Sequence, residues 1–503
     1  MKRHPGARPR LYAWCAAVAC VLLQVPAEAQ TIVVNGSKFM VKELAGVGRL
    51  PSNLRDEFGE TFGSVSGLVA DKSRWQRRFD GSYTGTFFAT PDRGYNAVGT
   101  IDYTARINRL DFRFKPAPAT ASGLPQNQIA LKLTNSTRLF ETLGGEVLPL
   151  SGLDPVPGGV ATGGARVVRR MPELPQAFNG KLSLDAEGIV ILADGTRLVS
   201  DEYGPSIYRF SRSGRLIGAL PVAASVRPLR NNVTDYSSNN PTQGQSAPVP
   251  ANPSYGRSNN QGFEGLSLSP DGKTLFVCLQ SAARQDGAAT SAANRDHTRL
   301  FTYDVDDPDR IVLTGEYIVK LPKFQQGTST LVAAQSEILA LSDTQLLILP
   351  RDSNGFHVGT QQSLLRRVDV IDIRHATNVL GMPVEAAVAP GGVLDPTITP
   401  ALYTSWLDIN DNTQLNRFGL VNGVVTGFDN LSEKWEGLAL LPALDPAHPD
   451  DYFLFIANDN DFATTDGFHA GAAYDAGWDN PTTFLVWRVS IDIAPEKRHG
   501  HRK

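Results

Sequence analysis

Cysteine is almost absent from this chain of 503 residues. Two of its three cysteines, Cys15 and Cys20, lie in an N-terminal segment that we expect to be cleaved, which leaves only Cys278. A single cysteine excludes an intramolecular disulfide, so the fold must be stabilised by a large core. Cys278 stands in the apolar run 275–279, which predicts a buried apolar side chain rather than a catalytic thiol.

Long apolar runs are missing beyond the N-terminus, where residues 1–29 predict a signal peptide. This segment joins basic residues, the apolar stretch 11–25 and the small-residue pattern Ala27-Glu28-Ala29, so that the mature chain would begin at Gln30. An N-terminal membrane anchor is the alternative. No later run approaches the roughly 20 apolar residues of a spanning helix. We therefore expect a secreted protein, or a periplasmic one in a Gram-negative source, with a basic disordered tail over 496–503.

An excess of either charge is also absent, since 48 basic residues face 51 acidic ones and the net charge is −3. This balance argues against a nucleic-acid or membrane partner. We separately expect a small-molecule ligand and a monomeric protein. Four glycosylation sequons are present and matter only in a eukaryotic source. They begin at Asn35, Asn135, Asn232 and Asn430.

The familiar motifs of several enzyme classes are missing. The chain has no Gly-x-Ser-x-Gly elbow, no phosphate-binding loop of the Walker type, no His-Glu-x-x-His and no Cys-x-x-Cys. Its histidines are scattered, and no pair has the spacing of metal ligands. These absences argue against a histidine-rich zinc site and leave a serine hydrolase triad without support.

A short phrase recurs along the chain. An acidic residue, often followed by glycine, opens an apolar run, and a second apolar run after a turn ends in charged or amide residues. The phrase begins at Glu187-Gly188, Glu264-Gly265, Glu337-Ile338 and Glu436-Gly437, and more weakly at Ser66-Gly67. The corresponding ends are Asp92-Arg93, Asp201-Glu202, Gln280-Ser281, Arg351-Asp352 and Asn458-Asp459-Asn460-Asp461. Such repetition predicts a repeated structural unit.

Each unit has the pattern of a four-stranded antiparallel meander, with short β-runs and glycine-containing turns. Meanders in series predict an all-β fold, namely a β-propeller that spans residues 30–495 and carries long loop insertions. Five blades are visible. We expect six, within a range of five to seven, once the segments 129–150 and 401–428 are placed. The N-terminal run 31–41 is expected to pair with the last blade and close the ring. A two-domain β-sandwich is the alternative.

The acids of the phrase are the candidate functional residues. Carboxylate oxygens suit hard cations, above all Ca²⁺, which takes six to eight oxygen ligands. The predicted metal ligands are Glu187, Asp201, Glu202, Glu436, Asp459 and Asp461. The predicted catalytic residues are Arg93, Arg351, Asp352 and Glu264, because an arginine beside bound metal can hold phosphate. The alternative is structural, since a glutamate on an innermost strand could accept backbone hydrogen bonds from the next blade.

These motifs together resemble the phytase-like family, described as having an esterase-like activity of phytase. The resemblance covers roughly residues 46–491, and it implies a secreted propeller that hydrolyses phosphoesters with the help of Ca²⁺. Few lysines or arginines stand near the phrases, which does not favour phytate itself as the substrate. Two alternatives remain. One is a non-catalytic, calcium-stabilised propeller that binds a glycan, a metabolite or a protein. The other is a calcium-dependent esterase or lactonase with His297 or His375 as its base.

Overall fold

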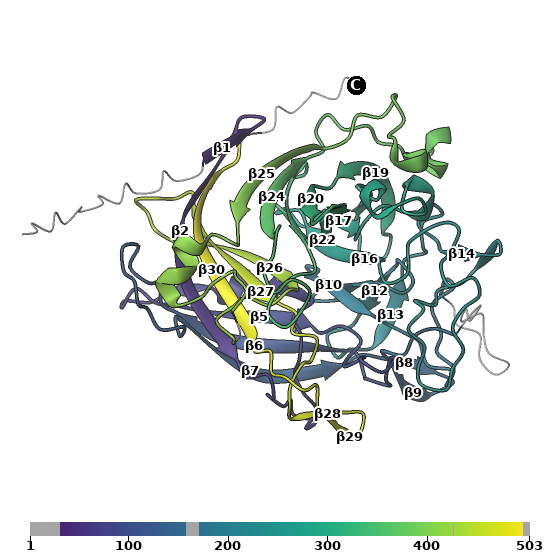
Figure 1. Cartoon of the computed structure of the whole chain (residues 1–503), viewed down its shortest axis with the longest axis horizontal. Helices are drawn as coiled ribbons and strands as arrows, with labels where there is room; N and C mark the ends of the chain where they lie inside the picture. Colours follow the sequence, from purple (N-terminus) through teal and green to yellow (C-terminus); the bar gives the residue numbers. More distant parts are fainter. Residues whose placement is uncertain (1–30, 157–170, 426, 496–503) are drawn as a thin grey trace, which may run out of the picture.

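The computed structural model describes residues 31–156, 171–425 and 427–495, which form β-sheets arranged around one axis (Figure 1). The predicted signal peptide and the predicted basic tail lie outside these residues. Within them, five antiparallel sheets of four or five strands form the blades of a propeller. The prediction of an all-β propeller is therefore confirmed, and the expected number of six blades is corrected to five.

The blades follow one another along the chain, and each is a meander. Blade 1 contains β3 (Gly67–Ala70), β4 (Gln76–Arg77), β5 (Tyr83–Thr90), β6 (Arg106–Phe114) and β7 (Ile129–Arg138). Blade 2 contains β10 (Ala186–Ile191), β11 (Arg197–Asp201), β12 (Ile207–Phe210) and β13 (Leu216–Ala219). Blade 3 contains β16 (Phe263–Leu268), β17 (Thr274–Leu279), β18 (His297–Asp304) and β19 (Val312–Lys320). Blade 4 contains β22 (Ala334–Ala340), β23 (Gln345–Arg351), β24 (Arg367–Asp372) and β25 (Leu402–Asp408).

Blade 5 joins the two ends of the chain. Its strands are β26 (Trp435–Pro442), β27 (Asp451–Asn458), β30 (Thr482–Asp492), β2 (Ser37–Leu50) and β1 (Thr31–Val34). Strand β2 pairs antiparallel with β30 along its whole length, from Lys38 opposite Asp492 to Leu50 opposite Thr482. The predicted closure of the ring by the N-terminal run is therefore confirmed, and it extends nine residues beyond the expected segment, from 41 to 50.

The two segments expected to supply further blades are outer parts of existing ones. Strand β7 is the outermost strand of blade 1, and β25 is the outermost strand of blade 4. The rest of the segment 129–150 forms the small hairpin of β8 (Phe140–Leu143) and β9 (Glu146–Pro149). The pattern of apolar residues identified these strands correctly, but it does not say which neighbour a strand pairs with.

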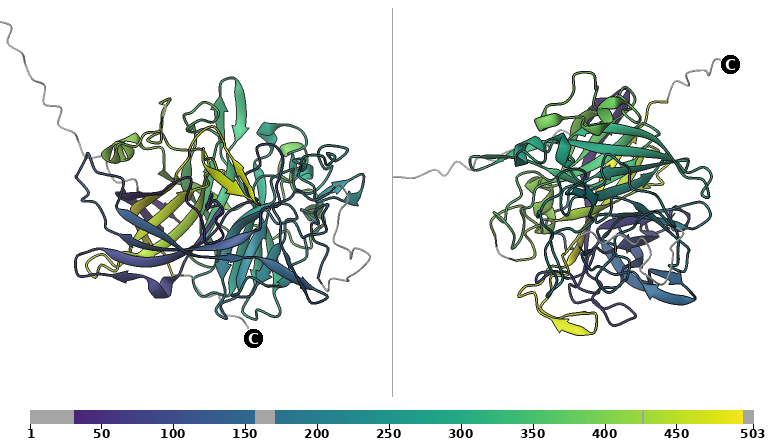
Figure 2. Two further views of the ribbon diagram at one scale, coloured as in Figure 1. Left: turned by 90° about the horizontal axis from the view of Figure 1, so that it is seen from below. Right: turned by 90° about the vertical axis from the view of Figure 1, so that its right-hand side faces the viewer.

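Short elements fill the connections between strands. The remaining hairpins are β14 (Leu229–Arg230) with β15 (Val233–Thr234), β20 (Lys323–Gln326) with β21 (Ser329–Val332), and β28 (Gly467–His469) with β29 (Ala472–Tyr474). The last of these, in yellow, stands out from the blades (Figure 2). The helical turns are α1 (Asn412–Leu415), η1 (Lys72–Arg74), η2 (Arg284–Asp286), η3 (Ala292–Asn294), η4 (Pro383–Ala386), η5 (Pro390–Gly392) and η6 (Asn416–Phe418). No helix among the described residues is long and apolar enough to cross a membrane.

The hydrophobic core is divided among the contacts between neighbouring blades. One cluster of buried side chains lies at each of the five contacts, and Cys278 belongs to the cluster between blades 3 and 4, as expected of an apolar side chain. Trp406 and Trp435 are buried between blades 4 and 5, so both pack the core. Burial of this kind contributes roughly 25 cal/mol for each Å² of apolar surface, and it stabilises the ring without disulfides.

The glycine of the recurring phrase lies where innermost strands approach one another most closely. A Cβ atom added at Gly265 would stand 2.5 Å from the backbone nitrogen of Ile338 in blade 4. One added at Gly188 would stand 2.7 Å from the backbone nitrogen of Leu266 in blade 3. Real Cβ atoms do not come this close to backbone, so glycine is required at both positions.

We expect Gly265→Ala to destabilise the protein by about 1–3 kcal/mol, because the added methyl group forces two innermost strands apart. The measurement is the free energy of unfolding from urea denaturation. Gly218→Ala is the matched control, since a Cβ atom on that outer strand would meet nothing closer than 3.9 Å. Equal stability of the two variants would contradict the role assigned to the glycine.

Candidate active site

The antiparallel pairing of the first two strands in each blade brings both halves of the phrase to one end of the propeller. The start of each innermost strand stands opposite the end of the second strand, as Gly67 does with Thr90 and Trp435 does with Asn458. The acids that open the phrase and the polar residues that end it therefore meet at the same end. This is the convergence that the repeated pattern predicted.

A shift of register falls on the glutamate in three of the five blades. The pairing shifts between Ala186 and Ile189 in blade 2, between Phe263 and Leu266 in blade 3, and between Trp435 and Gly437 in blade 5. In blade 4 the shift falls one residue earlier, and Glu337 is paired with Leu349. Such a shift is the signature of a β-bulge, which re-aims the side chain of the bulged residue. Three of the four glutamates, Glu187, Glu264 and Glu436, line a common cavity.

That cavity measures about 440 Å³ and receives residues from all five blades, so it lies where the innermost strands converge. Its charged lining comprises Asp92, Arg93, Asp185, Glu187, Glu202, Glu264, Arg295, Arg351, Asp352, Glu433, Lys434 and Glu436. Eight of these twelve side chains are acids and four are basic. Crowded carboxylates repel one another unless cations or protons compensate them, so the compensation of each acid is the central question.

One group of acids is Asp185, Glu187 and Glu202 in blade 2. All three are buried, and each offers one oxygen within 4.8 Å of the other two. Arg93 forms an ion pair with Asp185 at 2.9 Å. Oε2 of Glu187 and Oε1 of Glu202 are buried without a hydrogen-bond partner among the described residues. One guanidinium cannot balance three ionised carboxylates, so this group requires either protons or a further cation.

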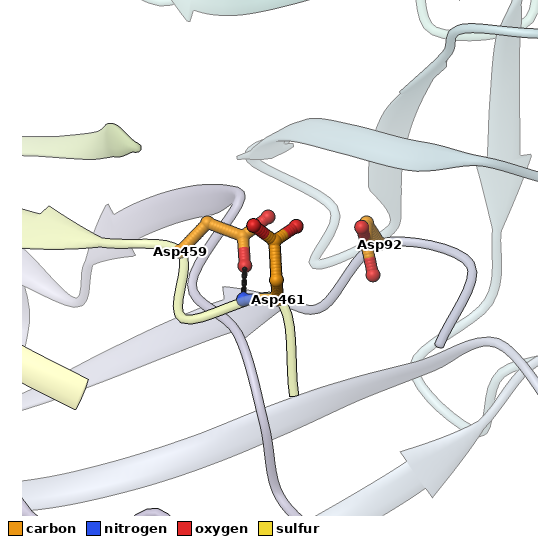
Figure 3. A group of neighbouring side chains, drawn as sticks. All are labelled: Asp92, Asp459 and Asp461. Carbon is orange, nitrogen blue, oxygen red and sulfur yellow. Dashed lines mark hydrogen bonds between the residues drawn. The ribbon is translucent and has the colours of Figure 1, made fainter. Parts of the chain in front are cut away.

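A second group contains Asp92, Asp459 and Asp461, which face one another from two separate loops (Figure 3). The ammonium group of Lys434 is 3.2 Å from Asp459 and 2.7 Å from Asp461. The backbone N–H of Asp461 also donates to Asp459 at 2.6 Å. Burial by itself lowers the pKa of Lys434, but these aspartates outweigh it and raise that pKa well above its ordinary value, which keeps the ammonium charged. The second group therefore already holds a cation that belongs to the chain.

The six predicted metal ligands are thus not one set. Glu187 and Glu202 belong to the first group, and Asp459 and Asp461 belong to the second. Glu436 lines the cavity but forms an ion pair with Arg351 at 2.6 Å. Asp201 does not line the cavity, because its carboxylate accepts hydrogen bonds from the backbone N–H groups of Asp185, Tyr203 and Gly204 at 2.9–3.2 Å.

The glutamate of blade 4 accepts backbone hydrogen bonds from a neighbouring blade, which was the structural alternative to a role in the site. Glu337 is buried, and one of its oxygens accepts hydrogen bonds from the backbone N–H groups of Leu266 at 3.1 Å and Ile338 at 2.8 Å. Leu266 belongs to blade 3, so this side chain ties two blades together. It is absent from the cavity lining. The same position of the phrase therefore serves as a support in one blade and as a cavity wall in three others.

All four predicted catalytic residues line the cavity. Arg351 is fixed by Glu436 and by Ser336, whose hydroxyl accepts from its Nε at 2.8 Å. Asp352 accepts a hydrogen bond from the backbone N–H of Leu364 at 2.5 Å, so it also shapes a loop. Glu264 accepts from Gln280, and its Oε2 is buried without a partner among the described residues.

Five charged residues of the cavity were not among the predicted site residues. Asp92 belongs to one of the strand ends of the repeated pattern, and Asp185 lies two residues before the phrase of blade 2. Glu433 and Lys434 lie within three residues of the phrase of blade 5, so proximity to the motif was an available signal. Arg295 follows η3 in an irregular loop. Nothing in the sequence around Arg295 indicates that its side chain reaches the axis.

Comparison with known proteins places the chain in a family. The model of the phytase-like family, described as esterase-like activity of phytase, matches residues 60–462. A protein of Arthroderma benhamiae, named an uncharacterized secreted protein, is 36% identical over 462 residues, which cover 84% of this chain and 87% of that protein.

Solved structures with a similar arrangement are much more distant. A gluconolactonase of Xanthomonas campestris is 9% identical with a TM-score of 0.28, covering 93% of this chain and 96% of its own. A luciferin-regenerating enzyme is 8% identical with a TM-score of 0.30, covering 89% of this chain and 97% of its own. At these values neither structure supports an argument about this protein.

The raised pKa values of the buried acids determine how the stability of the metal-free protein depends on pH. Burial and neighbouring acids raise the pKa of Glu202 to about 8, and burial raises that of Asp92 to about 7. Carboxyl groups in an unfolded chain titrate near pH ~4. Between these values the folded protein binds more protons than the unfolded chain, so the free energy of unfolding falls as the pH rises. The melting temperature in EDTA should therefore fall between about pH 5 and about pH 8.

The control for this dependence is Glu202→Gln, which removes one titrating group and should flatten the fall of the melting temperature. A melting temperature of the original protein that stays constant or rises over the same interval would contradict the assignment of protonated acids to the cavity.

Proposed function

Because the chain belongs to the phytase-like family, we propose that it is an exported hydrolase that cleaves phosphoesters in its central cavity with the help of a bound metal ion, Ca²⁺. One observation supports this function above all others. When its acids are ionised, the buried group of Asp185, Glu187 and Glu202 carries more negative charge than Arg93 can compensate, and two of its oxygens have no partner among the described residues.

The donor set fits a hard divalent cation. Three carboxylates from one blade can supply part of the six to eight oxygens that Ca²⁺ prefers, and water and substrate can supply the rest. Unpartnered carboxylate oxygens in a buried site are costly, and a cation would compensate them. When bound, Ca²⁺ polarises a phosphoryl oxygen and lowers the pKa of a bound water molecule. The group of Asp92, Asp459 and Asp461 fits a metal less well, because Lys434 already lies there.

The residues of the chain itself would bind and orient the phosphoryl group. The guanidinium groups of Arg93 and Arg351 are each held by a carboxylate, at 2.9 and 2.6 Å. Cations fixed in this way need no rearrangement when charge develops on phosphate oxygens, which is the basis of electrostatic catalysis. The planar fork of arginine also matches two phosphate oxygens at once.

The esterase or lactonase alternative lacks its base. His297 begins β18 and His375 is exposed in a turn, and neither belongs to the described residues that line the cavity. The non-catalytic alternative, a propeller with structural calcium, needs no base and differs from the proposed function only in turnover. An assay for turnover therefore separates the two.

Export is proposed from the predicted signal peptide and from the relative that is named a secreted protein. If the source glycosylates its exported proteins, the sequons differ in accessibility. Asn35, Asn135 and Asn232 are exposed, whereas Asn430 is buried and donates a hydrogen bond to the carbonyl of Gln361 at 2.8 Å. Glycans are expected only at the three exposed positions.

We expect the purified protein to hydrolyse an aryl phosphate in Ca²⁺ and to lose this activity in EGTA, because the chelator removes the proposed metal. The measurement is release of the aryl alcohol, with an aryl carboxylate ester and phytate assayed in parallel. No turnover of any substrate, together with a melting temperature that Ca²⁺ raises, would favour the non-catalytic propeller over the proposed hydrolase.

Glu187→Gln should weaken Ca²⁺ binding about tenfold or more and lower the turnover in proportion, because a charged ligand becomes neutral. The measurement is calorimetric titration with Ca²⁺. The matched control is Glu337→Gln at the same position of blade 4, where the amide oxygen can still accept from Leu266 and Ile338. Unchanged Ca²⁺ affinity in Glu187→Gln would show that the metal site lies elsewhere.

A further inference from the structure

The four basic residues of the cavity differ in how their charge is compensated. Arg93 is paired with Asp185, Arg351 with Glu436, and Lys434 with Asp459 and Asp461. Arg295 lines the same cavity, and no carboxylate among the described residues forms an ion pair with it. In a cavity with twice as many acids as bases, one guanidinium therefore has no counter-charge.

The contacts of Arg295 are neutral. With the amide of Gln261 placed so that its oxygen faces the guanidinium, that oxygen accepts from both terminal nitrogens of Arg295 at 2.7 and 3.0 Å. The amide nitrogen of Gln261 then donates to the hydroxyl of Ser281 at 2.7 Å. Nε of Arg295 is buried without a partner among the described residues. Gln261 thus orients the guanidinium but, as a neutral amide, leaves its charge uncompensated.

The acid next to Arg295 in the chain is already paired with another residue. Asp296 forms an ion pair with Lys323 at 3.0 Å, and Lys323 begins the hairpin of β20 and β21. Strand β21 also packs against η3, the turn that directly precedes Arg295. The hairpin and the loop that carries Arg295 therefore form one continuous wall of the cavity.

Most of the rest of this wall is apolar, and Gln326 of β20 is its polar member. Phe324, Leu331 and Val332 of the hairpin line the cavity together with Ala292 of η3 and Ala334 of β22. The opposite side, formed by blades 1, 2 and 5, carries Asp92, Asp185, Glu187, Glu202, Glu433 and Glu436. A ligand in the cavity therefore meets a single uncompensated cation next to an apolar surface, whereas six of the eight acids come from the other three blades.

We propose that Arg295 binds the phosphoryl group of the substrate and that the wall of Phe324 and Leu331 contacts an apolar alcohol portion beside it. The substrate class is accordingly a phosphomonoester of an apolar or aromatic alcohol. A ring that carries several phosphates would place charged groups against the apolar wall, where nothing compensates them. This assignment rests on the proposed function for its reaction, but the binding of the phosphoryl group can be measured without any turnover.

The experiment is calorimetric titration of the Ca²⁺-loaded full chain with phenylphosphonate and with methylphosphonate, neither of which is a phosphoester that can be hydrolysed. Arg295→Gln should weaken binding of both probes about tenfold or more, since a charge-assisted hydrogen bond is lost. Arg295→Lys keeps the positive charge but lacks the planar guanidinium fork, so its affinity for each probe should lie between that of the original protein and that of Arg295→Gln. Arg310→Gln removes one positive charge from an exposed turn of the same blade and should change neither affinity by more than about twofold.

Phe324→Ala tests the apolar wall separately. It should weaken binding of phenylphosphonate severalfold and leave binding of methylphosphonate unchanged, because only the first probe carries an apolar ring. Benzoate carries the same ring with a carboxylate in place of the phosphonate, so it tests whether the site prefers a phosphoryl group. If benzoate binds as tightly as phenylphosphonate, the assignment of a phosphoryl group is overturned. Equal loss of both phosphonates in Phe324→Ala would overturn the assignment of the wall.

Wild-type affinity for both phosphonates in Arg295→Gln, or no binding of either by the original protein, would overturn the role of Arg295. If Arg295→Gln fails to fold, as judged by its melting temperature, Arg295→Lys and Phe324→Ala decide the question. Binding that depends on Arg295 in a protein without turnover would refute the proposed hydrolase and support the anion site alone.

Discussion

The close approach of the innermost strands is the constraint on which the rest of this structure depends. Around a ring of five blades these strands come so near one another that Gly188 and Gly265 have no room for a Cβ atom. The same crowding coincides with the register shift that turns the preceding glutamate toward the axis. The geometry that closes the ring is therefore also the geometry that concentrates carboxylates at its centre, so stability and chemistry cannot be varied independently here.

Concentrated carboxylates must be compensated, and the side chains and backbone of this molecule do so by two different means. Glu337 and Asp201 accept hydrogen bonds from backbone N–H groups, which makes them supports. Glu436 is paired with Arg351, and Asp459 is paired with Lys434. Among the described residues, the acids of blade 2 are the ones that keep buried oxygens without partners while also standing close together. The proposed metal site is thus distinguished from a support by what remains uncompensated, and not by the presence of acids.

The sequence predicted the parts of the structure that follow from local patterns. The recurring phrase identified the blades, and the N-terminal run 31–41 was correctly predicted to pair with the last blade and close the ring. The number of blades was wrong because β7 and β25 have the pattern of strands, and pairing depends on contacts distant in the chain. The grouping of the acids was beyond prediction for the same reason, since Asp201 and Glu202 are neighbours in sequence and yet only Glu202 faces the cavity. The path of an irregular loop sets the position of Arg295, and no residue pattern encodes that path.

The two sides of the cavity come from different parts of the chain. One side comes from the repeated strands, and the other comes from connections between strands. The acids and their paired cations come from positions that recur from blade to blade, so the ring itself supplies them. Arg295 and the hairpin of β20 and β21 come from connections specific to blades 3 and 4. Changes in those connections alter the wall that contacts the organic part of a ligand while the strands around the axis keep their places. Under the proposed function, the substrate could therefore change while the close approach of the innermost strands at the glycines stays as it is.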